Sequence, residues 1–256
     1  MTATLKFQDA TAVITLNRPE ALNALNAEMI RTLGILIDEV GRSNARVLII
    51  VGSGTKSFCA GADVKGILGK DPGRQLEFAR IGQQTFARLD DLNIPSIAVI
   101  SGFAFGGGLE LAMSCSFRVA TSSARMGLPE IKLGLIPGYG GTQRLTRLVG
   151  AAKALELVTT GRNITAEEAE RIGLVNRIED GEDLVAIGLG FAENLGNPAP
   201  AAFKMARDAV LKGIGLSLQE GFELEARMFA AATQTQDATE GVTAFLEKRR
   251  AAFAGV

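Results

Sequence analysis

The first half of the chain contains short, continuous runs of apolar residues, and longer segments with helical periodicity separate them. Such runs occupy residues 12–16, 47–51, 96–101 and 117–120, and their polar members are Thr15, Ser96, Ser101 and Arg118. They do not alternate between apolar and polar residues, as a strand with one solvent-exposed face does. Continuous apolar strands between helices are typical of a sheet that is covered on both faces. The pattern therefore predicts an α/β architecture.

Helical patterns fill the intervening segments and dominate the second half of the chain. Helices are expected at residues 22–40, 74–92, 107–116, 141–148, 152–159, 166–172, 184–195, 199–211, 218–233 and 240–253, with one more extended segment at 174–178. Asn197-Pro198 is typical of a helix break. A chain of 256 residues has the length of one domain, or of one domain with a helical extension. We therefore expect an α/β core at residues 1–195 and a helical region at 196–256.

The chain contains no histidine, which limits its chemistry. A Ser-His-Asp triad, a Cys-His pair and a histidine-ligated zinc site are excluded, and no metal site is expected. Proton transfer would fall to carboxylates, Lys, Tyr, Cys or a held water molecule. The net charge of −1 gives no strong field, so neither nucleic acid nor an anionic membrane is expected as a partner.

The ends of the sequence and its two cysteines bear on location. The first ten residues lack the apolar core of a secretory signal, and the apolar runs are far too short to span a bilayer. Nothing besides Cys59 and Cys115 suggests a disulfide framework. We expect free thiols and a cytoplasmic location.

Two glycine-rich segments, 57–63 and 101–110, follow apolar runs. Taken singly, each is explained by a tight turn and by close packing of helix and strand. Together they suggest a site for a developing negative charge, since a glycine turn frees backbone N–H groups. The N–H of Gly107 would lie at a helix start, where the helix dipole strengthens its pull. An N–H from the first segment would complete a two-donor oxyanion hole.

Two glutamates lie between apolar neighbours. Glu110 is one turn into an otherwise apolar helical segment, and Glu130 follows Pro129 in an apolar stretch. Each could instead be a buried structural acid that pairs with an arginine such as Arg118 or Arg144. The two glutamates together with two donor segments favour a paired acid/base site.

At these residues the sequence resembles the enoyl-CoA hydratase (crotonase) family. The matching segments span residues 10 to 250 in the family's order. They are Phe58-Cys59-Ala60-Gly61-Ala62-Asp63, Gly106-Gly107-Gly108-Leu109-Glu110-Leu111-Ala112, Pro129-Glu130-Ile131, residues 135–145, residues 18–25 and residues 240–249. The resemblance implies a crotonase-like spiral of ββα units, followed by a helical trimerisation region that often builds a dimer of trimers.

The resemblance also implies the role of each site residue. The backbone N–H groups of Ala62 and Gly107 would bind the thioester carbonyl oxygen of a 2-enoyl-CoA. Glu110 would act as general base on the water that attacks C3, and Glu130 would supply a proton to C2. Residues with a substrate-binding role by the same resemblance are Ala21, Ala24, Ala60, Asp63, Val64, Lys65, Gly106, Pro129 and Gly138, with Phe245 and Lys248 reaching the pocket of a neighbouring subunit. No separate cofactor is implied, because coenzyme A is part of the substrate.

Other readings stay open at this point. Relatives with changed acid/base groups are isomerases, decarboxylases, hydrolases or dehalogenases, and the retained pair of glutamates favours a hydratase over them. A catalytically idle CoA-binding protein would be indicated by loss of a glutamate or of a loop glycine, and neither is lost. Some relatives bind RNA, but the arginines of 74–92 are balanced by acidic residues. Acyl chain length and metabolic pathway are not fixed by the sequence.

Overall fold

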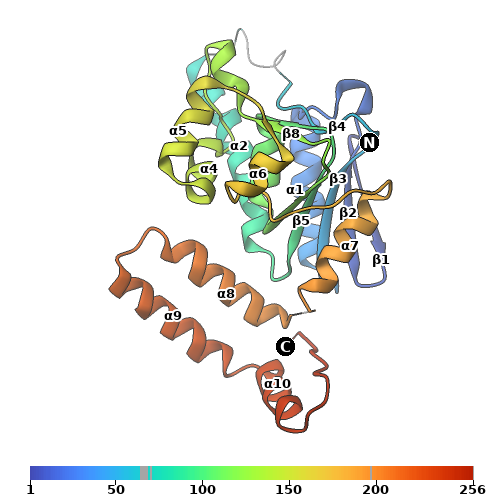
Figure 1. Ribbon diagram of the computed structural model, residues 1–256, viewed down its shortest axis with the longest axis vertical. Coiled ribbons are helices and arrows are strands. Elements are labelled where there is room, and N and C mark those ends of the chain that lie inside the picture. Colours follow the sequence, from blue (N-terminus) through green and yellow to red (C-terminus); the bar gives the residue numbers. More distant parts are fainter. Residues whose placement is uncertain (64–68, 70, 197, 256) are drawn as a thin grey trace. The chain divides into compact units, whose positions relative to one another are not determined.

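The structure is a computed structural model that describes residues 1–63, 69, 71–196 and 198–255. The chain divides into two compact units, Met1–Ala192 and Glu193–Val256. Figure 1 shows the strands within the first unit and the helices of the C-terminal segment. Among the described residues, no helix is both long enough and apolar enough to cross a bilayer.

A six-stranded sheet forms the centre of the first unit. Its strands, in the order in which they pair, are β1 (Ala3–Gln8), β2 (Thr11–Leu16), β3 (Val47–Gly52), β5 (Ser96–Ile100), β7 (Phe117–Ala120) and β10 (Arg177–Ile178). β1 runs antiparallel to β2, and all other pairs are parallel. Strand β1 was not predicted from the sequence. In the extended segment predicted at 174–178, only the residues of β10 form a strand.

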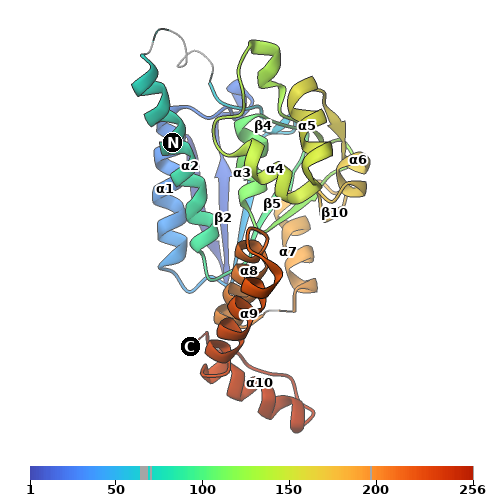
Figure 2. The ribbon, with the colours of Figure 1, turned by 90° about the vertical axis from the view of Figure 1, so that its left-hand side faces the viewer.

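Both faces of this sheet are covered, as the continuous apolar runs predict. Leu48 and Ile50 of β3 point into the main core, which they share with residues of α1 (Ala27–Gly41) and α2 (Pro72–Asp91). Ile49 points the other way and contacts Gly188 of α7 (Leu184–Asn194). Figure 2 shows α1 and α2 on one side of the strands and α7 on the other.

A second, four-stranded sheet has two of its strands within the predicted glycine-rich segments 57–63 and 101–110. Its strands, in pairing order, are β4 (Ser57–Cys59), β6 (Phe103–Phe105), β8 (Arg125–Gly127) and β9 (Ile164–Thr165). The first three run parallel, and β9 is antiparallel to β8. A strand of three residues is too short to show a periodicity, so the sequence gives no sign of this sheet.

The two sheets together build a spiral of ββα units. In each unit one strand joins the large sheet, the next joins the small sheet, and a helix follows. The units are β3–β4–α2, then β5–β6–α3 (Gly107–Ser114), then β7–β8 with the short helix η3 (Pro129–Leu133) and α4 (Gly141–Val149). The strands keep the same order in both sheets, which confirms the predicted spiral. The helices η1 (Pro19–Ala21), α5 (Ala151–Thr160) and α6 (Ala166–Arg171) complete the unit.

The predicted helix at 22–40 begins only at Ala27. Leu22 and Asn23 adopt left-handed backbone angles, with φ of 50° and 57°, which a helix cannot contain. The Asn26 side chain then accepts a hydrogen bond from the N–H of Met29 and caps α1.

The second unit consists of α8 (Pro200–Gly213), α9 (Leu218–Ala232) and α10 (Gln236–Leu246), with α8 packed against α9. The helix predicted at 240–253 is wrong in its bounds, because α10 ends at Leu246. Lys248 has a φ of 55°, and the Asp237 carboxylate accepts hydrogen bonds from the N–H groups of Ala254 and Gly255. The end of the chain therefore turns back along α10 instead of continuing it.

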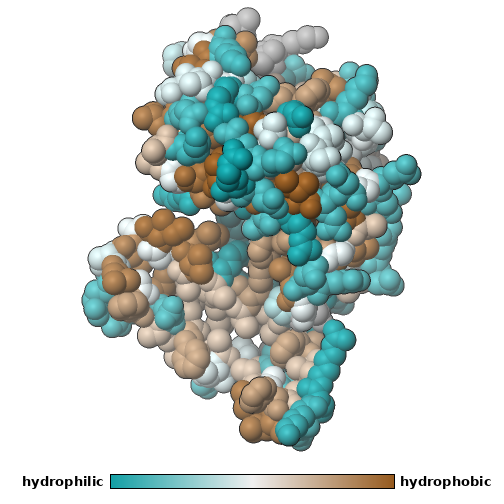
Figure 3. Space-filling view, viewed as in Figure 1, coloured by the Kyte–Doolittle hydropathy of each residue, from teal (hydrophilic) through white to brown (hydrophobic). Residues whose placement is uncertain are grey.

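Apolar side chains are exposed over the helices of this second unit. The residues with large exposed apolar side chains are Val210, Leu211, Ile214, Leu216, Leu218, Phe222, Phe229, Val242, Phe245 and Leu246. The space-filling view shows such side chains gathered over α8 and α9 (Figure 3). A patch of this kind usually marks an interaction surface in a soluble protein.

Candidate active site

Three segments with predicted site residues leave neighbouring strands of the small sheet at the same edge. Ala62 follows β4, Gly107 follows β6, and Glu130 follows β8. Because these strands are parallel neighbours, their carboxyl ends lie side by side. The small sheet, which the sequence does not reveal, is thus what brings the three segments together.

The amides of Ala62 and Gly107 lie close together. Leu25 forms a parallel bridge with Ala62, in which the N–H of Leu25 donates to Gly61 and its carbonyl accepts from Asp63. The N–H of Ala62 therefore points away from Leu25. A Cβ atom built on Gly107 would lie 3.4 Å from the nitrogen of Ala62. Within the described part of the chain, neither amide has an acceptor, so both are available as donors.

Gly106 shapes the turn between β6 and α3. Its φ of 47° lies in the left-handed region, where side chains are disfavoured. A Cβ atom at this position would lie 2.7 Å from Oε1 of Glu130. A side chain is therefore excluded twice, by backbone conformation and by the adjacent carboxylate.

Glu110 is buried in α3, with 1% of its surface exposed. Its Oε1 accepts hydrogen bonds from the N–H of Tyr139 at 2.8 Å and from the N–H of Gly141 at 2.7 Å. Burial raises the pKa of this carboxyl group to about 7, although the hydrogen bond from Gly141 acts in the opposite direction and lowers the pKa. The nearby charge of Glu130 raises the pKa further. The group can therefore exchange a proton near neutral pH.

Glu130 lies in the first turn of η3, directly after Pro129. It is partly buried, and burial raises its pKa above the ordinary value. Its Oε2 is enclosed and has no hydrogen-bond partner among the described residues. An enclosed oxygen without a partner favours the protonated form, because a charge there is poorly solvated.

Neither arginine that could have explained the glutamates contacts them. Arg118 is buried and donates to the carbonyl oxygens of Leu174 and Cys115. Arg144 forms two hydrogen bonds with the carboxylate of Asp90, at 3.2 and 2.6 Å. The interpretation of Glu110 and Glu130 as structural acids paired with these arginines is wrong.

The turn at residues 18–25 is joined to the segment after β4 by backbone hydrogen bonds. The N–H of Ala60 donates to Leu22, and that of Asp63 donates to Leu25. An ion pair of 3.7 Å between Arg18 and Asp63 adds to this contact. Four predicted substrate-binding residues are thus brought together here: Ala21, Ala24, Ala60 and Asp63.

The other predicted substrate-binding residues fall into three groups. Gly106 and Pro129 lie beside the two glutamates, and the Gly138 carbonyl accepts a hydrogen bond from Gln83 of α2. Val64 and Lys65 lie outside the described residues. Phe245 and Lys248 belong to the second unit, at the end of α10.

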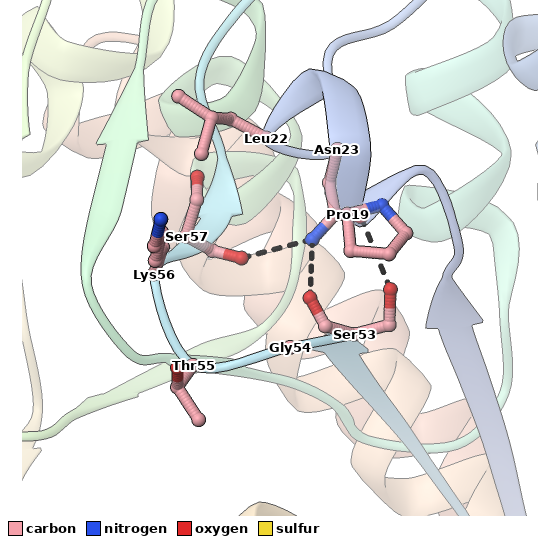
Figure 4. Close-up of a pocket in the computed structure, with 8 residues that line it drawn as sticks. All are labelled: Pro19, Leu22, Asn23, Ser53, Gly54, Thr55, Lys56 and Ser57. Carbon is pink, nitrogen blue, oxygen red and sulfur yellow. Dashed lines mark hydrogen bonds between the residues drawn. The ribbon is translucent and has the colours of Figure 1, made fainter.

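The turn at residues 18–25 also borders a surface cavity of about 240 Å³. Figure 4 shows the side chain of Asn23 between the turn and the loop after β3, where its amide donates to the carbonyl oxygens of Ser53 and Ser57. The residues that line this cavity are Pro19, Leu22, Asn23, Ser53, Gly54, Thr55, Lys56 and Ser57. No residue with a predicted catalytic role is among them.

The structure adds two functional groups that were not predicted from the sequence. They are the backbone amides of Tyr139 and Gly141, which donate hydrogen bonds to the Glu110 carboxylate. The glycines around Tyr139 were the available signal, but a fold is needed to show which carboxylate they face. Cys59 and Cys115 are buried free thiols whose pKa burial raises to about 12, so neither is a nucleophile. Throughout the described ranges, no cluster of Cys, Asp and Glu could hold a metal ion.

The spiral of ββα units and the paired carboxylates beside two open amides define a protein of the crotonase fold. The profile of the enoyl-CoA hydratase/isomerase family matches residues 6–255, and the chain belongs to that family.

Individual relatives are similar along almost the whole chain. YngF of Bacillus subtilis is 46% identical over 246 residues, which cover 96% of this chain and 95% of that protein. The short-chain-enoyl-CoA hydratase of Clostridium acetobutylicum is 40% identical, with 96% and 95% covered. The crystal structure of an enoyl-CoA hydratase from Bacillus anthracis superposes with a TM-score of 0.93 at 36% identity and covers 100% of both chains.

Proposed function

We propose that this protein is an enoyl-CoA hydratase, a hydro-lyase that adds water reversibly and syn across the C2–C3 double bond of a 2-trans-enoyl-CoA. The observation that carries the proposal is a pair of carboxylates in different environments beside two open amides. Glu110 is held by two N–H donors, whereas Glu130 has an enclosed oxygen without a partner. The name of the Clostridium acetobutylicum relative supports a short acyl chain.

The amides of Ala62 and Gly107 would bind the carbonyl oxygen of the thioester. Attack of water on C3 moves an electron pair toward that oxygen, so negative charge develops there. Two preorganised N–H donors, one of them at the start of α3, stabilise this charge as it forms. Removing one such donor typically costs about 3–4 kcal/mol of transition-state stabilisation.

Glu110 would be the general base and Glu130 the general acid. The two N–H bonds favour the ionised form of Glu110, which takes a proton from water as the oxygen attacks C3. The proton on Glu130 then goes to C2, and a proton relay between the groups restores the starting state. The two charges repel each other, which favours one proton shared by the pair.

Coenzyme A would enter as part of the substrate, and no separate cofactor is proposed. The residues proposed to hold it are Ala21, Ala24, Ala60, Asp63, Val64 and Lys65, with Gly106, Pro129 and Gly138 near the acyl group. Phe245 and Lys248 would reach the pocket of a neighbouring subunit. This role fits the exposed side chain of Phe245.

We further propose that the chain forms homotrimers or a dimer of trimers in the cytoplasm. The exposed apolar side chains of α8 and α9 support self-association, and the two free thiols suit a reducing compartment. A short-chain hydratase of this kind would serve β-oxidation or another pathway with the same intermediate.

The test is hydration of crotonyl-CoA, followed as loss of enoyl-thioester absorbance. The wild type should turn over, and Glu110→Gln and Glu130→Gln should each lose at least about a thousandfold in kcat. Glu182→Gln, in an exposed loop, is the matched control and should keep full activity. If the wild type binds crotonyl-CoA without converting it, the short-chain hydratase proposal fails, and a shift of the double bond instead would indicate an isomerase.

A further inference from the structure

The side chain of Tyr139 is enclosed by α2. Its ring lies 5.6 Å from the ring of Phe78 and 5.7 Å from that of Phe86, measured between centroids. Gly82 lies between these two residues on the same helix. A Cβ atom at Gly82 would lie 2.2 Å from Cδ1 of Tyr139, so the ring fills the space that a side chain would need.

The opposite edge of the ring faces Gly107, whose N–H is one of the two proposed donors to the thioester oxygen. A Cβ atom at Gly107 would lie 3.2 Å from Cδ2 of Tyr139. The Tyr139 hydroxyl group is buried and has no hydrogen-bond partner among the described residues. Within the described ranges, the ring is therefore held by packing against its neighbours and not by a hydrogen bond of its hydroxyl group.

The backbone of the same residue is part of the site. The N–H of Tyr139 is one of the two donors to the Glu110 carboxylate. The preceding carbonyl, that of Gly138, accepts a hydrogen bond of 2.9 Å from Gln83 of α2. The helix α2 thus fixes this loop through the ring and through the backbone.

We propose that Tyr139 is a positioning residue for Glu110. Packing of its ring against α2 fixes the residue and thereby keeps its backbone N–H in hydrogen-bond contact with the Glu110 carboxylate. This inference deepens the proposed function and rests on it for the role of Glu110. It assigns α2 a part in catalysis although Gly82 and Phe86 do not touch the reacting atoms.

The consequence is a coupling between ring packing and proton affinity. The charged or titratable groups that face Glu110 from the described elements around it are Glu130, Arg144 and the Tyr139 phenol. A loosened Tyr139 amide leaves Glu130 and Arg144 in place and removes one stabilising donor. The ionised form of Glu110 is then disfavoured, so its pKa rises.

The experiment compares pH profiles of kcat/KM for crotonyl-CoA between pH 5.5 and 9. Gly82→Ala forces the ring aside and should move the acid limb up by about one pH unit, the size expected for loss of one charge-assisted hydrogen bond. Relative to the wild type, activity should fall about fivefold at pH 7, and this difference should disappear toward pH 9. A variant that is merely damaged would lose activity equally at every pH, and that result would overturn the proposal.

Four further variants separate the role of the ring from that of the hydroxyl group and from that of the helix. Gly34→Ala, a glycine on α1 where a Cβ atom has room at 3.5 Å, should leave the profile in place. Tyr139→Phe keeps the ring and should keep the acid limb, whereas Tyr139→Ala should move it as Gly82→Ala does. In Gly82→Ala/Tyr139→Ala the shift should not exceed that of Tyr139→Ala alone, because both changes act through one contact.

Tyr139→Ala also serves as the test if Gly82→Ala does not fold. A second measurement keeps the inference separate from the proposed function. The Glu110 carboxyl can be titrated by ¹³C NMR of glutamate-labelled protein, assigned through Glu110→Gln. An unchanged Glu110 titration in Tyr139→Ala overturns the positioning role even in an active enzyme. If Tyr139→Ala shifts the Glu110 titration but the wild type leaves crotonyl-CoA unchanged, only the hydratase proposal is contradicted.

Discussion

Glu110 is a buried ionisable residue, and its burial opposes its charge. The residue is 1% exposed, and burial raises the pKa of its carboxyl group from an ordinary 4.5 to about 7. The unfolded chain loses this proton more readily than the folded chain. The group therefore contributes its full stability below pH 4.5, and this contribution is lost as the pH rises through about 7.

Glu110→Gln should therefore stabilise the protein at alkaline pH while it abolishes activity. The glutamine oxygen can still accept from both amides, and no charge is buried. We expect the free energy of unfolding of the variant to exceed that of the wild type by less than about 1 kcal/mol near pH 5 and by about 3 kcal/mol at pH 8.5. Urea unfolding at both pH values measures this. The exposed-loop variant Glu182→Gln should show no such difference, and equal stability of Glu110→Gln and wild type at pH 8.5 would contradict the argument.

A substitution at Gly106 should affect catalysis through Glu130. In Gly106→Ala, the new methyl group meets the Glu130 carboxylate and the left-handed backbone becomes strained. We expect kcat for crotonyl-CoA to fall by at least about a hundredfold with the fold retained. Gly134→Ala is the matched control, since its φ of 71° imposes similar strain and its Cβ atom would meet nothing within 4 Å. Equal losses in the two variants would assign the effect to strain alone.

At the residue scale, the sequence predicts which groups are unusual but not how they meet. Apolar neighbours mark Glu110 and Glu130 as enclosed residues, and the structure places both in enclosed positions. The donors to Glu110 are backbone groups from residues distant in the chain. No side-chain pattern encodes such a contact, so only the fold reveals it.

At the scale of elements, the turn at residues 18–25 depends on one side chain. Asn23 is fully buried and has a φ of 57°. Its oxygen accepts from the N–H of Arg18, and its amide donates to the carbonyl oxygens of Ser53 and Ser57 (Figure 4). Asparagine tolerates the left-handed region better than most residues and supplies both kinds of hydrogen-bonding group.

Asn23→Ala should lower the free energy of unfolding by about 3 kcal/mol, because it leaves three backbone groups without their partner. Asn23→Gly relieves the backbone strain but not the lost bonds, so it should recover only a small part. Asn17→Ala removes an exposed asparagine and should cost less than about 0.5 kcal/mol. Chemical denaturation of the three variants decides this, and a neutral Asn23→Ala would show that the turn is held by other contacts.

The bounds of an element were predictable where local sequence signals are strong. Prediction failed where contacts with residues distant in the chain set the bounds. The apolar runs give β3, β5 and β7 almost to the residue, since both faces of these strands are buried. The end of α10 was not predictable, because it depends on Asp237 capturing the chain end. The four short strands of the small sheet pair with one another, and each is too short to carry a sequence pattern of its own.

At the scale of the whole molecule, α9 presents an apolar face that its own unit does not cover. Phe222 and Phe229 are 55% and 71% exposed, and their spacing of two helical turns places them on one face. Burying a phenylalanine side chain gains about 1.5–3 kcal/mol. Exposure of such an apolar face to water is unfavourable, and association that buries the face removes this free-energy cost.

We expect the protein to sediment as the proposed trimer or dimer of trimers, and charge on this face should dissociate it. We expect Phe222→Glu/Phe229→Glu to shift the sedimenting mass toward the monomer, since burying two carboxylates in an apolar contact is unfavourable. Ile35→Glu on α1 makes the same chemical change at another exposed apolar residue and should leave the mass unchanged. Analytical ultracentrifugation at several concentrations measures all three proteins. A monomeric wild type would contradict the proposed assembly, whereas an associated double variant would show that the contact between subunits lies on another surface.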